Sequence, residues 1–70
     1  MTAKIKVVVN GFEEEVPSDA SISFLIKYFS ELDPHLIVEL NGRFVYPNRY
    51  SSTIVKENDR VEFINPNLGG

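Results

Sequence analysis

Alternating apolar residues open the chain and predict a β-hairpin. In segment 4–10 an apolar residue stands at every second position, and segment 12–16 alternates in the same sense, which is the period of a strand with one buried face. Asn10-Gly11 lies between them, and this pair favours the positive φ angles that both central positions of a type I′ turn require. Pro17 ends the second run, because proline has no N–H to donate to a sheet.

The next segment changes to a helical period. Ile22, Leu25, Phe29 and Leu32 are spaced by 3, 4 and 3 residues, so they form one apolar stripe along a helix, and Ile26 widens this stripe toward the core. The pattern predicts one amphipathic helix whose apolar side packs on a sheet.

Capping residues set the expected ends of this helix. Ser21 is the predicted N-cap, since a serine oxygen accepts a hydrogen bond from a free N–H of the first turn. Asp33-Pro34 is the predicted end, because the residue before a proline disfavours helical backbone. Phe24 and Tyr28, four residues apart, are expected to form a second, half-exposed pair on the helix surface.

The second half of the chain predicts another hairpin. Segments 36–40 and 43–46 flank a second Asn-Gly pair, and the next proline ends the second of these strands. Segment 48–53 is rich in turn residues and predicts one short helical turn, with Ile54 and Val55 buried beneath it.

Segment 60–64 is the last predicted strand, with Val61 and Phe63 turned toward the core. One helix covers only one face of a sheet, so the other face is expected to be solvated. The order of elements fits a mixed five-stranded sheet whose first and last strands are parallel neighbours at its centre. The predicted fold class is therefore α+β, the ubiquitin-like β-grasp, with residues 1–64 as a single domain and residues 65–70 as a flexible C-terminal tail.

Composition limits what so small a chain does by itself. The 70 residues hold no cysteine and one histidine, His35, so neither disulfides nor a metal site is expected, and a self-contained Ser/His/Asp triad is disfavoured. Ten acidic against seven basic residues give a net charge of −3, which disfavours a nucleic-acid surface. With 43% hydrophobic residues the chain is expected to fold, but not to be an enzyme, and no catalytic residue is assigned.

Targeting and membrane segments are not expected. No apolar run of signal-peptide length follows the first lysines, and no uninterrupted apolar stretch exceeds three residues. A cytoplasmic protein without membrane contact is therefore predicted.

Five stretches of the chain, in order, fit the pattern of a known family. They are Val8-Val9-Asn10-Gly11, Ile22-Ser23-Phe24-Leu25-Ile26, the run from Val38 through Asn41-Gly42 to Pro47, Asp59-Arg60-Val61-Glu62-Phe63, and Gly69-Gly70. In these stretches the chain resembles the small sulfur-carrier proteins of the ThiS type, with the MoaD-like carriers as close relatives. The family usually has Gly-Asp before the last strand, where this chain has Asn58-Asp59, and asparagine tolerates the same left-handed backbone.

Gly69-Gly70 carries the chemistry that the resemblance implies. A terminal carboxylate is anionic at neutral pH and a poor electrophile, so an activating enzyme has to convert it to a mixed anhydride with AMP before sulfur is attached. Glycine has no Cβ and passes through a narrow channel, and residues 65–70 reach up to about 20 Å when extended. The residues expected to thread the partner's active site are Pro66, Asn67, Leu68 and Gly69.

By resemblance, the Gly70 carboxylate is adenylated, becomes a thiocarboxylate and donates its sulfur to thiazole formation in thiamine biosynthesis. ATP and Mg²⁺ belong to the partner, a ThiF-like or MoeB-like adenylating enzyme of the ubiquitin-activating type, so the chain itself needs no cofactor. A donor of the cysteine desulfurase type supplies the sulfur, and a thiazole synthase or another acceptor receives it. The free carrier is expected to be a monomer.

Strand alternation also predicts an apolar patch on the sheet face away from the helix. Val8, Ile37 and Ile64 fall on this face when the other apolar strand residues face the helix. The residues facing the helix are Ile5, Val7, Val9, Leu36, Val38, Leu40, Val61 and Phe63, and the polar rim of the patch is Lys6, Glu39, Arg60 and Glu62. Such a patch indicates a protein-binding site, so the three residues are the expected docking patch for the activating enzyme and the thiazole synthase.

Two other kinds of function are compatible with the sequence. A MoaD-like carrier for molybdopterin synthesis, or a ubiquitin-like modifier that conjugates through Gly70, has the same fold and tail. A β-grasp interaction module whose terminal glycines are incidental is the alternative of another class. The glutamates at 13–15 and His35 are expected to be solvated residues of a hairpin edge and of a loop.

Overall fold

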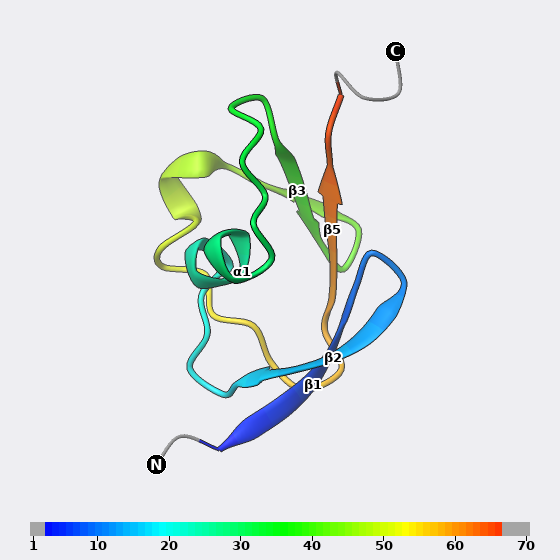
Figure 1. Ribbon diagram of the computed structural model, residues 1–70. Coiled ribbons are helices and arrows are strands. Elements are labelled where there is room, and N and C mark those ends of the chain that lie inside the picture. The colour runs from blue at the N-terminus through cyan, green and yellow to red at the C-terminus, as the bar shows by residue number, and fades with distance from the viewer. Residues whose placement is uncertain (1–2, 67–70) are drawn as a thin grey trace.

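Two hairpins and a last strand join into one five-stranded sheet that curves around an α-helix (Figure 1). The computed structural model describes residues 3–66. Its elements are β1 (Lys4–Val9), β2 (Phe12–Pro17), α1 (Ile22–Tyr28), β3 (Ile37–Leu40), β4 (Arg43–Val45), the 3₁₀ helix η1 (Pro47–Arg49) and β5 (Arg60–Ile64).

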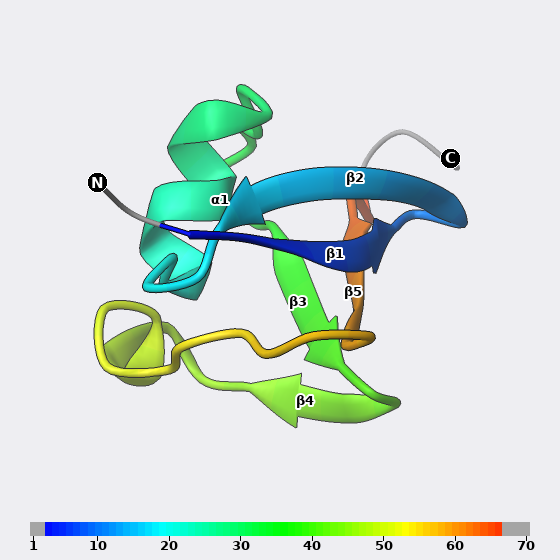
Figure 2. The ribbon, with the colours of Figure 1, turned by 90° about the horizontal axis from the view of Figure 1, so that it is seen from below.

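The strands follow the order β2-β1-β5-β3-β4. The central pair, β1 and β5, is parallel, with Val9 opposite Val61, and the other neighbours are antiparallel. Helix α1 packs on one face of this sheet (Figure 2), and the opposite face is called the open face below. The predicted mixed sheet with one helix on one face, the β-grasp fold, is confirmed.

Both Asn-Gly pairs form the tight turns that the sequence predicts. Asn10 and Gly11 have φ angles of 51° and 87°, and Asn41 and Gly42 have 53° and 82°. Positive φ at both central positions is typical of a type I′ turn, whose twist matches that of the flanking strands. Asn58 has a φ of 71°, so it takes the left-handed backbone at the position where the family usually has glycine.

The core lies between the helix and the inner face of the sheet. The large side chains almost completely removed from solvent are Val7, Val16, Ile22, Leu25, Val38, Val55 and Val61. They come from four strands, the helix and the connection before β5, so the strand alternation and the helical stripe converge on one core. Every strand residue that the sequence turns toward the helix belongs to this core or packs against it.

The start of α1 agrees with the prediction. The Oγ of Ser21 accepts a hydrogen bond from the Phe24 N–H at 3.0 Å, which makes Ser21 the N-cap. Phe24 and Tyr28 stack with ring centroids 5.5 Å apart, and their side chains are 39% and 59% exposed, so the half-exposed pair is confirmed. No helix in the described residues has both the length and the apolar character needed to cross a membrane.

The end of α1 differs from the prediction. The helix stops at Tyr28 rather than at Asp33-Pro34, because Ser30 takes a left-handed φ of 56° and turns the chain away. Leu32, predicted to extend the apolar stripe, lies beyond this turn with its side chain 85% exposed. The prediction for Leu32 is therefore wrong, because the apolar spacing in the sequence continues past the residue at which the helix ends.

The connection between β4 and β5 differs at two points. The helical turn η1 begins at Pro47, just before the predicted segment 48–53, and Tyr46 lies outside β4. Val55 is buried as predicted, but Ile54 is 44% exposed and its predicted burial is wrong. Neighbouring residues of extended backbone point to opposite sides, so only one of the two reaches the core.

Candidate functional site

The two hairpin asparagines hold β5, the strand that leads to the predicted tail, from both sides. On one side Asn10 Oδ1 accepts a hydrogen bond from Phe63 N–H at 2.8 Å, and Asn10 N–H donates to Val61 O at 2.9 Å. On the other side Asn41 Oδ1 accepts from Arg60 N–H at 2.9 Å, and Asn41 N–H donates to Arg60 O at 2.7 Å. The turns predicted from backbone preference therefore also anchor the last strand.

The predicted tail begins where β5 ends. Asn65, its expected first residue, is half-buried, and its Nδ2 donates a hydrogen bond to Glu31 Oε1 at 3.3 Å. Pro66 is exposed. The remaining predicted tail residues lie outside the described part of the chain, namely Asn67, Leu68, Gly69 and Gly70.

The open face of the sheet carries the three residues of the predicted docking patch. Ile37 lies opposite Ile64 in the β3–β5 pair, and the Ile64 side chain is 38% exposed. Val8 lies opposite Arg60 in the β1–β5 pair. Arg60 precedes Ile64 by four residues along β5, which at the usual rise of a strand places Val8 about 13 Å along the sheet from Ile64. The single cluster that the sequence predicts is therefore divided into the Ile37–Ile64 pair and a separate Val8.

Two aromatic side chains, neither of which the sequence pattern indicated as a site residue, extend the Ile37–Ile64 pair. Phe44 lies opposite Glu39 on the open face, and the same antiparallel register carried one residue past β4 brings Tyr46 opposite Ile37. The rings meet edge to face with centroids 4.6 Å apart, and the side chains are 47% and 64% exposed. The residue between them is buried, and successive side chains along a strand point to opposite faces, so both aromatic residues lie on the open face. The open-face patch is defined below as Ile37, Phe44, Tyr46 and Ile64.

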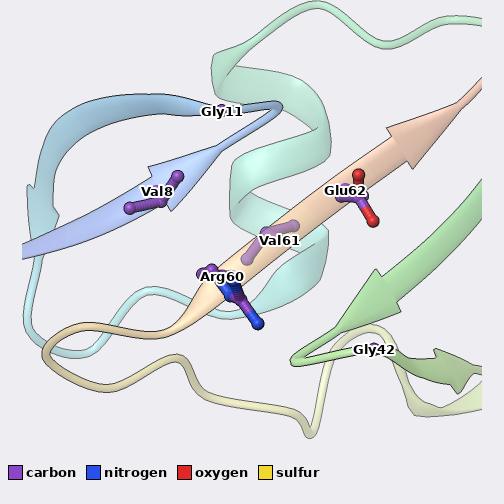
Figure 3. A pocket seen from close by; sticks show the side chains of 6 residues that line it. All are labelled: Val8, Gly11, Gly42, Arg60, Val61 and Glu62. Atoms are coloured by element: carbon purple, nitrogen blue, oxygen red, sulfur yellow. The ribbon is translucent and has the colours of Figure 1, made fainter.

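The other end of the open face holds a concavity of about 260 Å³ bordered by the two tight turns (Figure 3). Val8, Arg60 and Glu62 line it between Gly11 and Gly42. An apolar side chain beside a cation and an anion is typical of the rim of a protein interface, and β5 connects this rim to the open-face patch.

A second concavity, of about 250 Å³, lies on the helix side of the molecule, between α1, the connection after it and η1. Ile26, Leu36 and Tyr50 form its apolar part, and burial raises the pKa of the Tyr50 hydroxyl above its ordinary 10.0. Lys27 and Glu31 also line it. None of these residues was predicted as a site residue, because no local pattern joins the helix to η1.

The described residues do not assemble groups for metal binding. Among residues 3–66, no three His, Asp or Glu side chains lie close enough together to hold a metal ion, and no polar or charged side chain is buried. His35 is exposed, as expected for a loop residue.

The sheet, the single covered face and the anchored last strand together define a ubiquitin-like β-grasp protein. A model of the ThiS family matches residues 2–70. The chain therefore belongs to the ThiS family. It is a carrier of the ThiS type and not an enzyme, as the resemblance in the sequence implies.

A solved structure agrees with the family. The chain is similar to the thiamine biosynthesis protein (ThiS) from Geobacter metallireducens, with 27% sequence identity and a TM-score of 0.79. The match covers 86% of this chain and 91% of that chain. No curated protein matches the chain. The family and the solved structure favour the ThiS type over the MoaD-like alternative.

Proposed function

We propose that the Gly70 carboxylate is adenylated and then converted to a thiocarboxylate that supplies sulfur for thiamine biosynthesis. The observation that carries this proposal is the family match, which extends through Gly69 and Gly70. The similar structure from Geobacter metallireducens is a thiamine biosynthesis protein, which supports the same pathway for this chain.

Two steps account for every atom of the proposed chemistry. In the first, a carboxylate oxygen of Gly70 attacks the α-phosphorus of ATP, and pyrophosphate leaves. In the second, the terminal sulfur of a donor persulfide attacks the carbonyl carbon as the bond to AMP breaks, and a thiol reductant then supplies the two electrons that cleave the S–S bond and release the thiocarboxylate. A ThiF-like adenylating enzyme holds the ATP and Mg²⁺, and a cysteine-desulfurase-type donor supplies the sulfur, so this chain contributes the carboxylate and the surface that is recognised.

The open face is the proposed docking surface for the adenylating enzyme and the thiazole synthase. The open-face patch supplies exposed apolar area from three strands and the residue after β4, and Glu39 and Glu62 lie beside it. Exposed aromatic and aliphatic side chains with charged neighbours are typical of protein interfaces. Val8 and the concavity beside Arg60 form a second contact on the same face.

Exchange of labelled pyrophosphate into ATP by the cognate adenylating enzyme tests the first step. The chain is expected to support exchange, and the chain without Gly70 is expected not to, because the deletion withdraws the carboxylate by up to about 3.5 Å. Leu32→Ala is the matched control, since this side chain is 85% exposed in the connection after α1, and it is expected to leave exchange unchanged. Undiminished exchange without Gly70 would overturn the assignment of the reactive carboxylate.

A further inference from the structure

One side-chain hydrogen bond ties the end of β5 to the end of helix α1. Asn65 Nδ2 donates to Glu31 Oε1 at 3.3 Å across 34 residues of sequence, and the contact is partly buried. Asn65 is the residue directly before Pro66, where the predicted threading segment starts. The bond therefore joins the root of the tail to the body of the domain.

The acceptor of this bond stands on a fixed backbone. Ser30 has the left-handed φ of 56°, and its N–H donates to Lys27 O at 3.1 Å. The Glu31 N–H donates to Ile26 O at 2.9 Å. These two bonds form the Schellman motif that closes a helix, so the helix end determines where Glu31 stands.

The donor of the bond stands on an equally fixed strand. Phe63 is only 5% exposed, its N–H is bound by Asn10 Oδ1, and Ile64 is paired with Ile37. Pro66 follows, and a proline restricts the residue before it to extended backbone. Asn65 is thus held by the sheet before it, by the proline after it and by Glu31 at its side chain.

We propose that the Glu31–Asn65 hydrogen bond is a brace that sets the direction in which the segment after Asn65 leaves the domain, and so presents Gly70 to the adenylating enzyme. The inference rests on the proposed function. Glu31 and Asn65 act as positioning residues, through the chain and not by contact with the reacting carboxylate. A tail with an ordered root loses less conformational entropy on entering the partner's active site. The brace therefore lowers the KM of the adenylating enzyme for the carrier.

Two substitutions of Glu31 separate the brace from other roles. Glu31→Ala removes the acceptor, whereas Glu31→Gln keeps an acceptor oxygen at the same place without the charge. Asp19→Ala is the matched control, because it also removes one negative charge but lies in the exposed turn after β2. Circular dichroism checks that all three variants keep the fold.

Two readouts are measured on each variant. The first is the ¹⁵N order parameter of the Asn65 backbone amide in the free chain, which is expected to fall in Glu31→Ala and to keep its wild-type value in Glu31→Gln and Asp19→Ala. The second is pyrophosphate exchange with the cognate adenylating enzyme. There Glu31→Ala is expected to raise the KM for the carrier about 3- to 10-fold with kcat unchanged, which is the range that the loss of one hydrogen bond gives. Glu31→Gln is expected to have a KM close to that of wild type.

The outcomes are distinguishable. An Asn65 order parameter that stays at the wild-type value in Glu31→Ala overturns the brace, and a KM that rises without a change in that order parameter overturns it too, since Glu31 then contacts the partner directly. An unchanged KM beside a lowered order parameter overturns the role in delivery. If the wild-type chain supports no exchange at all, the proposed function fails, and the order parameter of Asn65 alone decides whether the brace exists.

Discussion

Positive φ angles at residues other than glycine mark the points where single side chains shape this domain. Within residues 3–66 they occur at Asn10, Ser30, Asn41 and Asn58. Asparagine tolerates the left-handed backbone because the amide of its short side chain forms hydrogen bonds with nearby backbone groups. Here two of the asparagines also bind the backbone of β5. The same residue type therefore supplies both the turn and the anchor of the strand before the tail.

Asn41 provides the sharpest test of this double role. Asn41→Ala is expected to lower the free energy of unfolding by about 2 kcal/mol, since alanine loses the tolerance for a φ of 53° and two hydrogen bonds, to the Asp59 carboxylate and the Arg60 N–H. Urea denaturation measures the change. Asn48→Ala, at an exposed position of η1, is the control and is expected to stay within about 0.5 kcal/mol of wild type. Equal stability of the two variants would contradict the role assigned to Asn41.

Tyr50 is expected to make the stability of the domain sensitive to alkaline pH. Burial raises the pKa of Tyr50 above 10.0, so the folded chain holds the phenol proton more tightly than the unfolded chain does. The contribution of the protonated Tyr50 to the free energy of unfolding is present in full below the unfolded pKa of about 10. It is lost as the pH rises through the folded pKa.

The Tyr50→Phe variant is therefore expected to lose less stability than wild type between about pH 8 and about pH 11, a range that brackets tyrosine ionisation. Urea midpoints at the two pH values measure the difference. Tyr46→Phe, whose side chain is 64% exposed, is the comparison and is expected to follow wild type. Parallel losses in wild type and Tyr50→Phe would show that Tyr50 does not contribute.

At the scale of elements, the strands follow from local pattern and the helix end does not. Alternation and the Asn-Gly pairs are local signals, so the hairpins, the inward side chains and the N-cap at Ser21 were predicted correctly. Serine has no preference for a left-handed backbone, and the apolar spacing continues to Leu32, so nothing local announces the turn at Ser30. The end is visible only in the folded backbone, where the N–H groups of Ser30 and Glu31 close the helix on Lys27 O and Ile26 O.

Ser30 is strained, and relieving the strain is expected to stabilise the domain. Ser30→Gly should raise the free energy of unfolding by about 0.5–1 kcal/mol, because glycine reaches a φ of 56° without a Cβ contact and the gain exceeds its greater entropy when unfolded. Chemical denaturation measures the shift. Ser30→Ala keeps the Cβ and is expected to give no gain, and a gain of equal size in both variants would argue against backbone strain as the cause.

At the scale of the whole molecule, the open face and the root of the tail depend on register that no local pattern reveals. The sequence placed Val8, Ile37 and Ile64 on the correct face, but the stagger between β1 and β5 separates Val8 from the other two. The contact between Glu31 and Asn65 joins residues 34 apart, so only the folded chain shows it. The tail residues themselves were predicted by resemblance and carry the proposed chemistry.

The divided open face predicts unequal effects of charge on docking. Ile64→Asp is expected to weaken binding to the adenylating enzyme about 10-fold or more, equivalent to about 1.4 kcal/mol, because it places a carboxylate inside the open-face patch. Val8→Asp lies outside that patch and is expected to weaken binding less. Titration calorimetry measures both, with circular dichroism as the check on folding.

Leu32→Asp is the control for these variants, since Leu32 is exposed but lies in the connection after α1, and it is expected to bind as wild type does. Binding that survives Ile64→Asp unchanged would move the docking surface elsewhere on the molecule.

The central claim is that the chain carries sulfur on Gly70, and the intact mass of the chain tests it most directly. The chain is incubated with ATP, Mg²⁺, the cognate adenylating enzyme, a cysteine-desulfurase-type sulfur donor with cysteine, and a thiol reductant, and its mass is then measured. We predict a gain that corresponds to one oxygen replaced by sulfur, absent when ATP is omitted or Gly70 is deleted. An unchanged mass with every component present, or the same gain in the chain without Gly70, would contradict the claim.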